Sequence, residues 1–296
     1  MAIIGAVLAL ILTACYPIYD ATCNGTLVTS SAGPISDPAI VEISGIDAGV
    51  RNPGIWWVHN DSGDTARVFA LDASGTTRGT FSFEGTPALD WEDLAVIPGP
   101  AAQTGMIYAA DIGDNTGTRA EIQVYRVAEP YVPLTGTPLV TTLSGVETLH
   151  LTYPDGAHDA EALMIDPIFG DLVIVAKSFS GGNANIYRAP ANLSAGSTTA
   201  LTKVGQVKLG TGLGNAVTGG DVTADGKSIA IRTYGQVRVF GRVTSSPLAN
   251  ALGGQPCSTF VPSESQGEAV GFSPNGKAFV TVSEGTGQML HRFSAP

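Results

Sequence analysis

The sequence has 296 residues, of which only 14% are charged, and the net charge at pH 7 is −11. Ordinary soluble domains contain roughly 25% charged residues, so most of the polarity here comes from uncharged side chains. Such an acidic surface repels phosphate backbones and anionic lipids, which argues against nucleic acid as a partner and limits membrane contact to a lipid anchor.

The N-terminus predicts export. Residues 2–12 form an apolar run of signal-peptide length, shorter than the ~20 residues of a membrane-spanning helix. The run ends at Leu-Thr-Ala-Cys (12–15), which resembles the lipobox of bacterial lipoproteins, where the cysteine is lipidated and becomes the mature N-terminus. No Lys or Arg precedes the run, so an ordinary cleavage site with an incidental Cys15 is the alternative. We expect a signal peptide over 1–14, a tether over 15–22, and a protein that is either a cell-envelope lipoprotein anchored through Cys15 or extracellular.

Five short apolar runs headed by acidic or hydroxyl-bearing residues recur along the chain. Aligning these runs places the following residues at equivalent positions: Ser44, Glu92, Glu161, Gly220 and Glu268. The intervals are roughly 50–70 residues, which is typical of β-propeller blades that each hold several short strands. The sequence therefore predicts that each run is the inner strand of one blade.

Period-2 patterning and β-branched residues predict the remaining strands. Second strands are expected at 55–59, 106–110, 172–176, 228–232 and 278–282. Third strands are expected at 67–71, 122–127, 185–188, 236–240 and 288–293. Outer strands are expected at 77–83, 148–152, 202–209 and 258–261.

The fifth repeat ends without an outer strand, and residues 24–30 can supply one. That strand would close the ring and remove an exposed sheet edge. We therefore predict an all-β fold with a single domain over 23–296, a five-bladed β-propeller closed by an N-terminal strand. Cys23 and Cys257 are an even pair once Cys15 is set aside, which in an oxidising compartment predicts one disulfide. It would join the outer strands of the fifth and fourth blades.

Acidic loops gather on one predicted face of the propeller. In such a fold, the loops before the inner strands and those between second and third strands open on the same side. Before the inner strands these loops contain Asp90, Asp155, His158, Asp159 and Glu264. Between second and third strands they contain His59, Asp61, Asp64, Asp111, Asp114, Lys177, Arg232 and Glu284. Asp61, Asp64 and Asp114 are either turn formers or ligands, and we expect this face to bind a small molecule, a glycan or a protein.

The inner-strand residues predict a calcium site on the propeller axis. Carboxylates that meet there cannot all stay ionised without a cation. Ca²⁺ takes six to eight oxygens in loose geometry, and no His/Cys cluster with zinc-ligand spacing occurs. The predicted ligands are Ser44, Glu92, Glu161 and Glu268, with Asp221 substituting for Gly220. The alternative is that these carboxylates only line a water-filled channel.

Two resemblances support this interpretation. The order Ser, Glu, Glu, Gly, Glu resembles the calcium ring of the soluble calcium-activated nucleotidases (apyrases), five-bladed propellers with the order Ser, Glu, Glu, Ser, Glu. The segments 42–46 and 91–96 are similar to motifs of that family, whereas Gly220 departs from it and its nucleotide-contacting segments are not found. The whole chain also resembles secreted actinobacterial propellers without established activity, through the segments 59–64, 90–95, 111–115, 153–156 and 158–163. This second resemblance implies fold and export but no substrate.

Two functions are consistent with these features. The first is an exported, monomeric envelope or extracellular binding module with calcium on its axis. The alternative is a calcium-dependent hydrolase of phosphoesters or related esters at the acidic face, in which the cation polarises the substrate. In that case Asp90, His158 or Asp159 would activate water, and Lys177 and Arg232 would stabilise developing negative charge.

Overall fold

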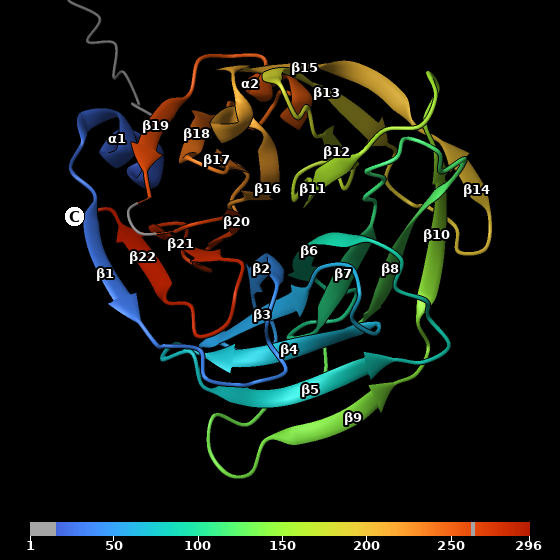
Figure 1. Ribbon diagram of the computed structural model, residues 1–296, viewed down its shortest axis with the longest axis vertical. Coiled ribbons are helices and arrows are strands. Elements are labelled where there is room, and N and C mark those ends of the chain that lie inside the picture. Colours follow the sequence, from blue (N-terminus) through green and yellow to red (C-terminus); the bar gives the residue numbers. More distant parts are fainter. Residues whose placement is uncertain (1–15, 262–263) are drawn as a thin grey trace, which may run out of the picture.

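The computed structural model describes residues 16–261 and 264–296, which form five sheets arranged around a central axis (Figure 1). The predicted signal peptide over 1–14 and the lipidation at Cys15 lie outside the described residues. Within them, no helix has the length and apolarity needed to cross a bilayer.

Each sheet is one blade. The strands named below for each blade are given from the axis outward, and each pairs antiparallel with the next. Blade 1 contains β2 (Ile43–Ala48), β3 (Ile55–Asn60), β4 (Arg67–Asp72) and β5 (Thr77–Phe83). Blade 2 contains β6 (Trp91–Pro98), β7 (Gly105–Asp111), β8 (Ile122–Ala128) and β10 (Glu147–Thr152). Blade 3 contains β11 (Ala160–Ile165), β12 (Leu172–Ala176), β13 (Gly181–Ala189) and β15 (Thr202–Thr211). Blade 4 contains β16 (Val217–Val222), β17 (Ser228–Thr233), β18 (Gln236–Gly241) and β19 (Cys257–Phe260). Blade 5 contains β20 (Gly267–Phe272), β21 (Ala278–Ser283) and β22 (Leu290–Ser294). The predicted all-β, five-bladed fold is confirmed.

The N-terminal strand completes the last blade as predicted. β1 (Val28–Ala32) pairs antiparallel with β22, with Val28 opposite Ser294 and Ala32 opposite Leu290. The strand begins a few residues later than the predicted segment 24–30. The ring is therefore closed between the two ends of the chain.

The residues before this strand form a helix. The sequence predicts a tether over 15–22, but Pro17–Asn24 instead form helix α1, which ends at Gly25 in a left-handed conformation. Its Ile18 is fully buried in a cluster with Val239 and Phe293, between blades 4 and 5. Cys23 of this helix is bonded to Cys257 of β19, so the predicted disulfide is confirmed, although Cys23 lies in the helix and not in the outer strand.

Two short strands were not predicted. β9 (Leu139–Leu143) runs parallel to β5 of blade 1, and β14 (Thr198–Ala200) runs parallel to β10 of blade 2. Each lies in the connection between the third and outer strands of the following blade, so the chain reaches back to the preceding blade before it completes its own. These insertions account for the two long intervals between the inner strands. The remaining helical segments are α2 (Leu248–Leu252) and the 3₁₀ turn η1 (Leu213–Asn215).

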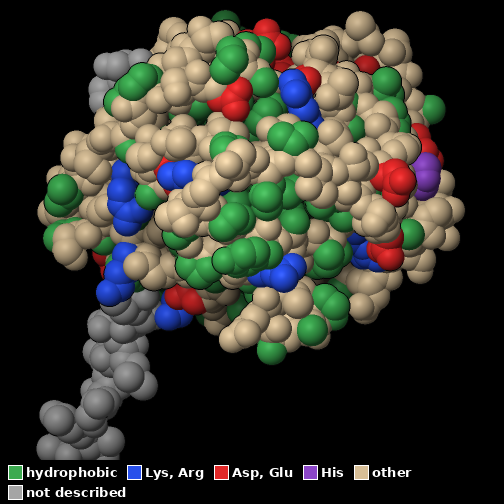
Figure 2. All heavy atoms as spheres, turned by 90° about the horizontal axis from the view of Figure 1, so that it is seen from below, with side chains coloured by type: hydrophobic (Ala, Val, Ile, Leu, Met, Phe, Trp, Pro, Cys, Tyr) green, Lys and Arg blue, Asp and Glu red, His purple; other side chains and the backbone are tan. Residues whose placement is uncertain are grey.

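The core lies between the blades. Strand residues alternate between the two sheet faces, so in β4 Val68 and Ala70 face blade 2 whereas Phe69 and Leu71 face blade 5. One hydrophobic cluster fills the space between each pair of adjacent blades and contains side chains from both. The outer edge of the disc, seen from the side of blade 1, carries scattered charges among uncharged side chains (Figure 2). This packing leaves the inner strands, which are buried throughout most of their length, to line the axis.

Candidate metal centre

A β-bulge occurs at the same place in every inner strand. Pairing with the second strand skips one residue in each blade, and the skipped residues are Ser44, Glu92, Glu161, Thr218 and Glu268. A bulge bends the strand and re-aims the side chain of the unpaired residue. We call these five residues the bulge ring.

The bulge in blade 4 corrects the alignment made from sequence. Thr218, and not Gly220, is equivalent to the three glutamates, because the register shifts between Val217 and Gly219. The Oγ1 atom of Thr218 donates to the carbonyl oxygens of Gly267 and Glu268 at 2.9 and 3.0 Å. Ser44 likewise donates to the carbonyl of Glu92 at 2.6 Å. Both hydroxyl positions of the ring are thus hydrogen-bonded to the next blade.

Asp221 does not join the ring, so its predicted role as a substitute ligand is wrong. It lies three residues beyond Thr218 along the same strand. Its two carboxylate oxygens accept the backbone N–H groups of Val222 at 2.6 Å and of Phe272 at 2.5 Å. Asp221 lines a cavity together with the first-to-second-strand turns, which lie on the face opposite the acidic loops.

Two glutamates of the bulge ring lie close to aspartates of the acidic loops. Two groups have oxygens within 4.8 Å of one another, one formed by Asp61, Asp90 and Glu92 and the other by Glu92, Asp159 and Glu161. Glu92 and Glu161 are buried, whereas the three aspartates are partly exposed. We call these five carboxylates the acidic mouth; its members come from blades 1, 2 and 3, and Glu92 belongs to both groups.

The acidic mouth concentrates negative charge in a poorly solvated place. Burial raises the pKa of Glu92 well above its usual range, and the charge of Glu161 adds to the shift. Burial raises the pKa of Glu161 to about 8 although Lys177 opposes the shift. Burial and the charges of Asp61 and Asp159 raise the pKa of Asp90 to about 6. A bound cation would relieve this repulsion.

One basic side chain pairs with these acids in the described part of the chain. The Nζ atom of Lys177 lies 2.5 Å from Oε1 of Glu161, and the Lys177 side chain is almost buried. The same Nζ lies 5.2 Å and 5.3 Å from the ring centroids of Phe179 and Tyr234. Lys177, predicted to stabilise developing charge, is therefore at the acidic mouth.

Glu268 retains a carboxylate oxygen without a hydrogen-bond partner among the described residues. Its Oε1 accepts from the Gln266 amide at 3.0 Å, whereas Oε2 has no such partner although the residue is only 6% exposed. The Gln266 amide also donates to Glu284, which lies beside the ring. Burial and the charge of Glu161 raise the pKa of Glu268 to about 8. An ionised buried oxygen with no partner is costly unless a ligand satisfies it.

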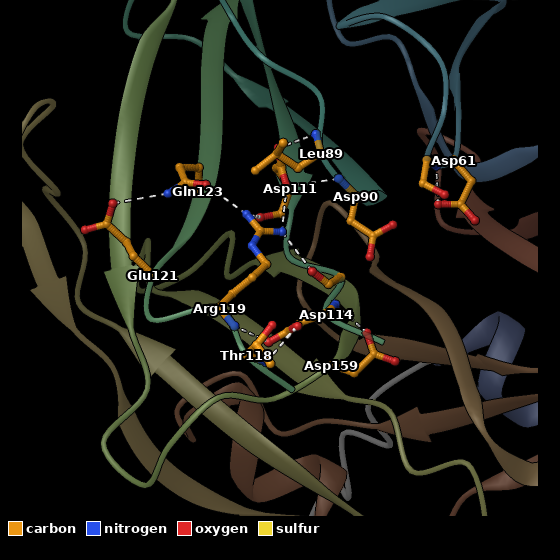
Figure 3. A network of polar contacts seen from close by, with 12 residues as sticks. Asp61, Leu89, Asp90, Asp111, Asp114, Thr118, Arg119, Glu121, Gln123 and Asp159 are labelled. Carbon is orange, nitrogen blue, oxygen red and sulfur yellow. Dashed lines mark hydrogen bonds and ion pairs between the residues drawn. The ribbon is translucent and has the colours of Figure 1, made fainter. Parts of the chain in front are cut away.

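A hydrogen-bond network holds Asp90 and Asp159 of the mouth, whereas Asp61 lies apart from it (Figure 3). The buried Asp111 carboxylate accepts the backbone N–H groups of Leu89 at 3.0 Å and Asp90 at 3.2 Å. Arg119 pairs with Asp111 at 2.7 Å and donates to the Gly113 carbonyl at 2.8 Å. The network places the Asp90 carboxylate next to Glu92. Arg119 was not singled out from the sequence, although it is a lone cation beside an acidic loop.

Asp114 belongs to the same network as a turn former. Its carboxylate accepts the backbone N–H groups of Thr118 at 3.0 Å and Arg119 at 2.7 Å. Its own N–H donates to Oδ1 of Asp159 at 2.8 Å. Asp111 and Asp114 therefore position the residues of the acidic mouth. Asp61, Asp64 and Asp114 were each expected to be either a turn former or a ligand, and of these only Asp61 belongs to a carboxylate group.

Two other predicted face residues are structural. His59 is fully buried, bonds the Asn60 carbonyl oxygen through Nδ1 at 2.8 Å, and packs edge-on against Trp91. Burial lowers its pKa to about 4, so it is neutral at physiological pH. Asp64 is paired with Arg67 at 2.8 Å and accepts from Asn60 at 2.7 Å.

Two predicted catalytic residues are held away from the acidic mouth. His158 bonds Asp155 at 2.9 Å and packs against Tyr153 and Tyr187, outside both carboxylate groups. Arg232 is fully buried and pairs with Glu264 at 2.5 Å. Arg232, predicted to clamp an anion, is buried away from solvent, and the partly exposed His158, predicted to act as a base, is paired with Asp155 outside the carboxylate groups.

Asp93 closes the axis below the ring. It is 1% exposed, and its Oδ2 accepts the N–H groups of Leu163 at 2.8 Å and Gly220 at 3.2 Å, from blades 3 and 4. Burial raises its pKa well above the usual range despite these bonds. The acidic mouth is thus separated from the opposite face of the propeller.

Comparison with known proteins finds no relative by sequence and two distant solved structures. No family model and no curated protein matches the sequence. A solved structure of Kuenenia stuttgartiensis hydrazine synthase is 14% identical with a TM-score of 0.45, covering 83% of this chain and 93% of that one. Chaetomium thermophilum Raptor is 10% identical with a TM-score of 0.45, covering 94% of this chain and 30% of that one.

Proposed function

We propose that the protein is an exported β-propeller that binds Ca²⁺ at the acidic mouth and presents it to a ligand from solvent. The observation that carries the proposal is the convergence of Asp61, Asp90, Glu92, Asp159 and Glu161, whose two groups share Glu92. These carboxylates come from separate blades, so a cation between them would cross-link the blades.

The donor set suits calcium. All ligands are oxygens, as Ca²⁺ prefers, and Ca²⁺ accepts six to eight of them in loose geometry. The partnerless Oε2 of Glu268 is a further buried donor on the ring. With Thr218 in the fourth position, the ring order becomes Ser, Glu, Glu, Thr, Glu, which is similar to the Ser, Glu, Glu, Ser, Glu order of the calcium-activated nucleotidases.

Lanthanide luminescence tests the cation site. Trp91 directly precedes Glu92, so Tb³⁺ bound at the mouth should be sensitised by tryptophan excitation and displaced by Ca²⁺. We expect Glu92→Gln to remove this signal because both carboxylate groups contain Glu92. Glu84→Gln changes an exposed glutamate outside both groups and should leave the signal unchanged. Wild-type protein that gives no calcium-displaceable signal would refute the proposal.

The role of a binding module is favoured over that of a hydrolase. Two members of the predicted catalytic set, His158 and Arg232, are engaged elsewhere, whereas the partly exposed Asp61, Asp90 and Asp159 leave the cation reachable from solvent. A glycan and acidic-ligand array probed with and without chelator tests the binding role. Retention of every array signal after chelation would contradict binding through the cation.

Hydrolysis is the second candidate because Lys177 lies beside the carboxylates, where it could hold a developing negative charge. Asp90 or Asp159 would then act as the base. The test is turnover on a panel of phosphoesters and lactones with calcium and with chelator. Calcium-dependent turnover that Lys177→Met removes would support this role, and absence of turnover from the whole panel would exclude it for these substrates.

Export is supported by the Cys23–Cys257 disulfide, since such bonds persist in oxidising compartments. Anchoring through Cys15 is tested by fractionating cells that express the full chain or Cys15→Ala. We expect the wild type in the membrane fraction and the variant in the soluble exported fraction. Identical distribution of the two proteins would exclude the lipid anchor and leave the extracellular alternative.

A further inference from the structure

A second recess lies on the face opposite the acidic mouth. It is a cavity of about 510 Å³, within the range of small-molecule sites. All five blades contribute to it: blades 1, 3, 4 and 5 through the turns that join their first and second strands, at Val50, Pro167, Ala224 and Pro274, and blade 2 through Tyr108 of β7. Asp93 closes the axis between this cavity and the bulge ring.

The cavity is mostly apolar, and its polar side chains include three carboxylates and Ser273. Asp47 and Asp221 line it, and each is 8% exposed. The third lining acid, Asp166, is neutralised by a buried two-pronged pair with Arg242 at 2.9 and 2.7 Å. No Lys, Arg or His is among the described lining residues, so Asp47 and Asp221 have no cationic partner there.

Backbone hydrogen bonds hold both carboxylates in place. Asp47 accepts the N–H groups of Ala48 and Val96, each at 2.6 Å. Asp221 is held in the same way by Val222 and Phe272, so each acid links its own blade to the next. A carboxylate oxygen has two lone pairs, and each oxygen therefore keeps one acceptor position for a ligand. Burial raises the pKa of Asp221 to about 7, and burial followed by the charge of Asp221 raises the pKa of Asp47, so a cation in the cavity would favour the ionised form of both acids.

We propose that this cavity binds a small organic cation, an amine with an apolar body, whose ammonium group donates hydrogen bonds to Asp47 and Asp221. An ammonium has three donors for the free acceptor positions, and the apolar walls contact the rest of the molecule. A metal ion fits less well, since two carboxylates among apolar side chains fall short of the six to eight oxygens that calcium takes. An anion fits poorly, because the described lining residues include acids but no Lys, Arg or His. This site is independent of the proposed cation site.

Binding of phenethylamine to the purified full chain in saturating calcium tests the proposal, with phenethyl alcohol as the neutral isostere. We expect the amine to bind at least about tenfold more tightly than the alcohol, as for a charge-assisted hydrogen bond. Asp221→Asn should weaken amine binding about tenfold by removing that charge. Ala224 is exposed at the rim, so Ala224→Trp should block the cavity, whereas Ala224→Ser should not.

Equal affinity for amine and alcohol, or unchanged binding in Ala224→Trp, would overturn the inference. So would absence of amine binding by protein with an intact thermal transition. If N-acetyl-lysine methylamide binds and phenethylamine does not, the cavity would be a site for a lysine side chain of a partner protein. That outcome would also overturn the inference. Glu92→Gln, which removes the cation site, should leave amine binding unchanged, so failure of one site is distinguishable from failure of the other.

Discussion

The Nζ atom of Lys177 lies 2.5 Å from Oε1 of Glu161, so one of the two buried glutamates of the acidic mouth is already paired with a cation of the chain. A calcium ion that uses Glu161 must compete with this ammonium group. We therefore expect the lysine to lower the calcium affinity of the proposed site.

Replacing Lys177 by methionine should tighten calcium binding by about tenfold, because a positive charge beside a cation ligand is removed while the side-chain volume is kept. Competition of Ca²⁺ with Tb³⁺ measures the change. Lys227→Met is the control, because Lys227 lies on an exposed turn of the opposite face and pairs with Asp225. Weaker binding in Lys177→Met would mean that the lysine organises the ligands and does not compete for them.

Thermal stability without calcium should fall as pH rises. The folded-state pKa values of Glu161 and Glu268 are about 8, whereas an unfolded glutamate titrates near ~4.3. Between these values the folded protein holds protons that the unfolded chain has released, so each step upward in pH destabilises the fold. We expect Tm in chelator to drop on the order of 5 °C from about pH 5.5 to about pH 8.5.

Calcium should remove this dependence, because the bound ion favours the ionised carboxylates, and its stabilising effect should therefore grow with pH. Scanning calorimetry with and without calcium measures both effects. Glu268→Gln should flatten the curve recorded in chelator, since it removes one of the shifted groups. A Tm that rises with pH in chelator would contradict the raised pKa values of the ring.

Truncating Arg119 to alanine should destabilise the protein by about 3 kcal/mol, because the fully buried Asp111 would lose its charge partner. The variant should also bind calcium more weakly, since Asp111 holds the backbone of Asp90. Urea unfolding and Tb³⁺ titration measure the two effects. Arg78→Ala, which breaks a more exposed pair with Asp72, should cost about 1 kcal/mol or less. Equal losses in both variants would argue against a special role of the Arg119 network.

Replacing Cys23 by serine should lower the free energy of unfolding by about 2–4 kcal/mol, because the bond to Cys257 closes a loop that spans most of the chain. Urea unfolding under non-reducing conditions measures this loss. Asp20→Asn, an exposed change in the same helix, is the control and should have little effect. A wild type whose stability is the same with and without reductant would contradict this role of the bond.

The strands of the blades were predictable because each has a local signal. Alternating apolar residues and β-branched side chains mark β3, β7, β12, β17 and β21, and each of these strands lies close to its predicted position. β9 and β14 also contain β-branched residues, but they are short, most of their side chains are exposed, and their position depends on pairing with a preceding blade.

The site was only partly predictable, for a related reason. Glu92, Glu161 and Glu268 carry the chemistry in their side chains, whereas Thr218 is marked only by a bulge in the pairing register, which the sequence does not display. The sequence alignment placed Gly220, next to the acidic Asp221, at the position that Thr218 occupies in the structure. Arg232 was misplaced because it belongs to strand β17 and its side chain is buried against Glu264, whereas His158 lies in a loop and turns toward Asp155.

Blade 5 combines strands from the first and the last residues of the described chain, β1 and β22, and the disulfide to β19 ties the N-terminal helix to the neighbouring blade. A nascent chain that has delivered only its N-terminal part therefore lacks the partner of its own first strand. Completion of the ring must wait for β22, so a product that stops before this strand leaves β1 unpaired and would be a target for proteolysis.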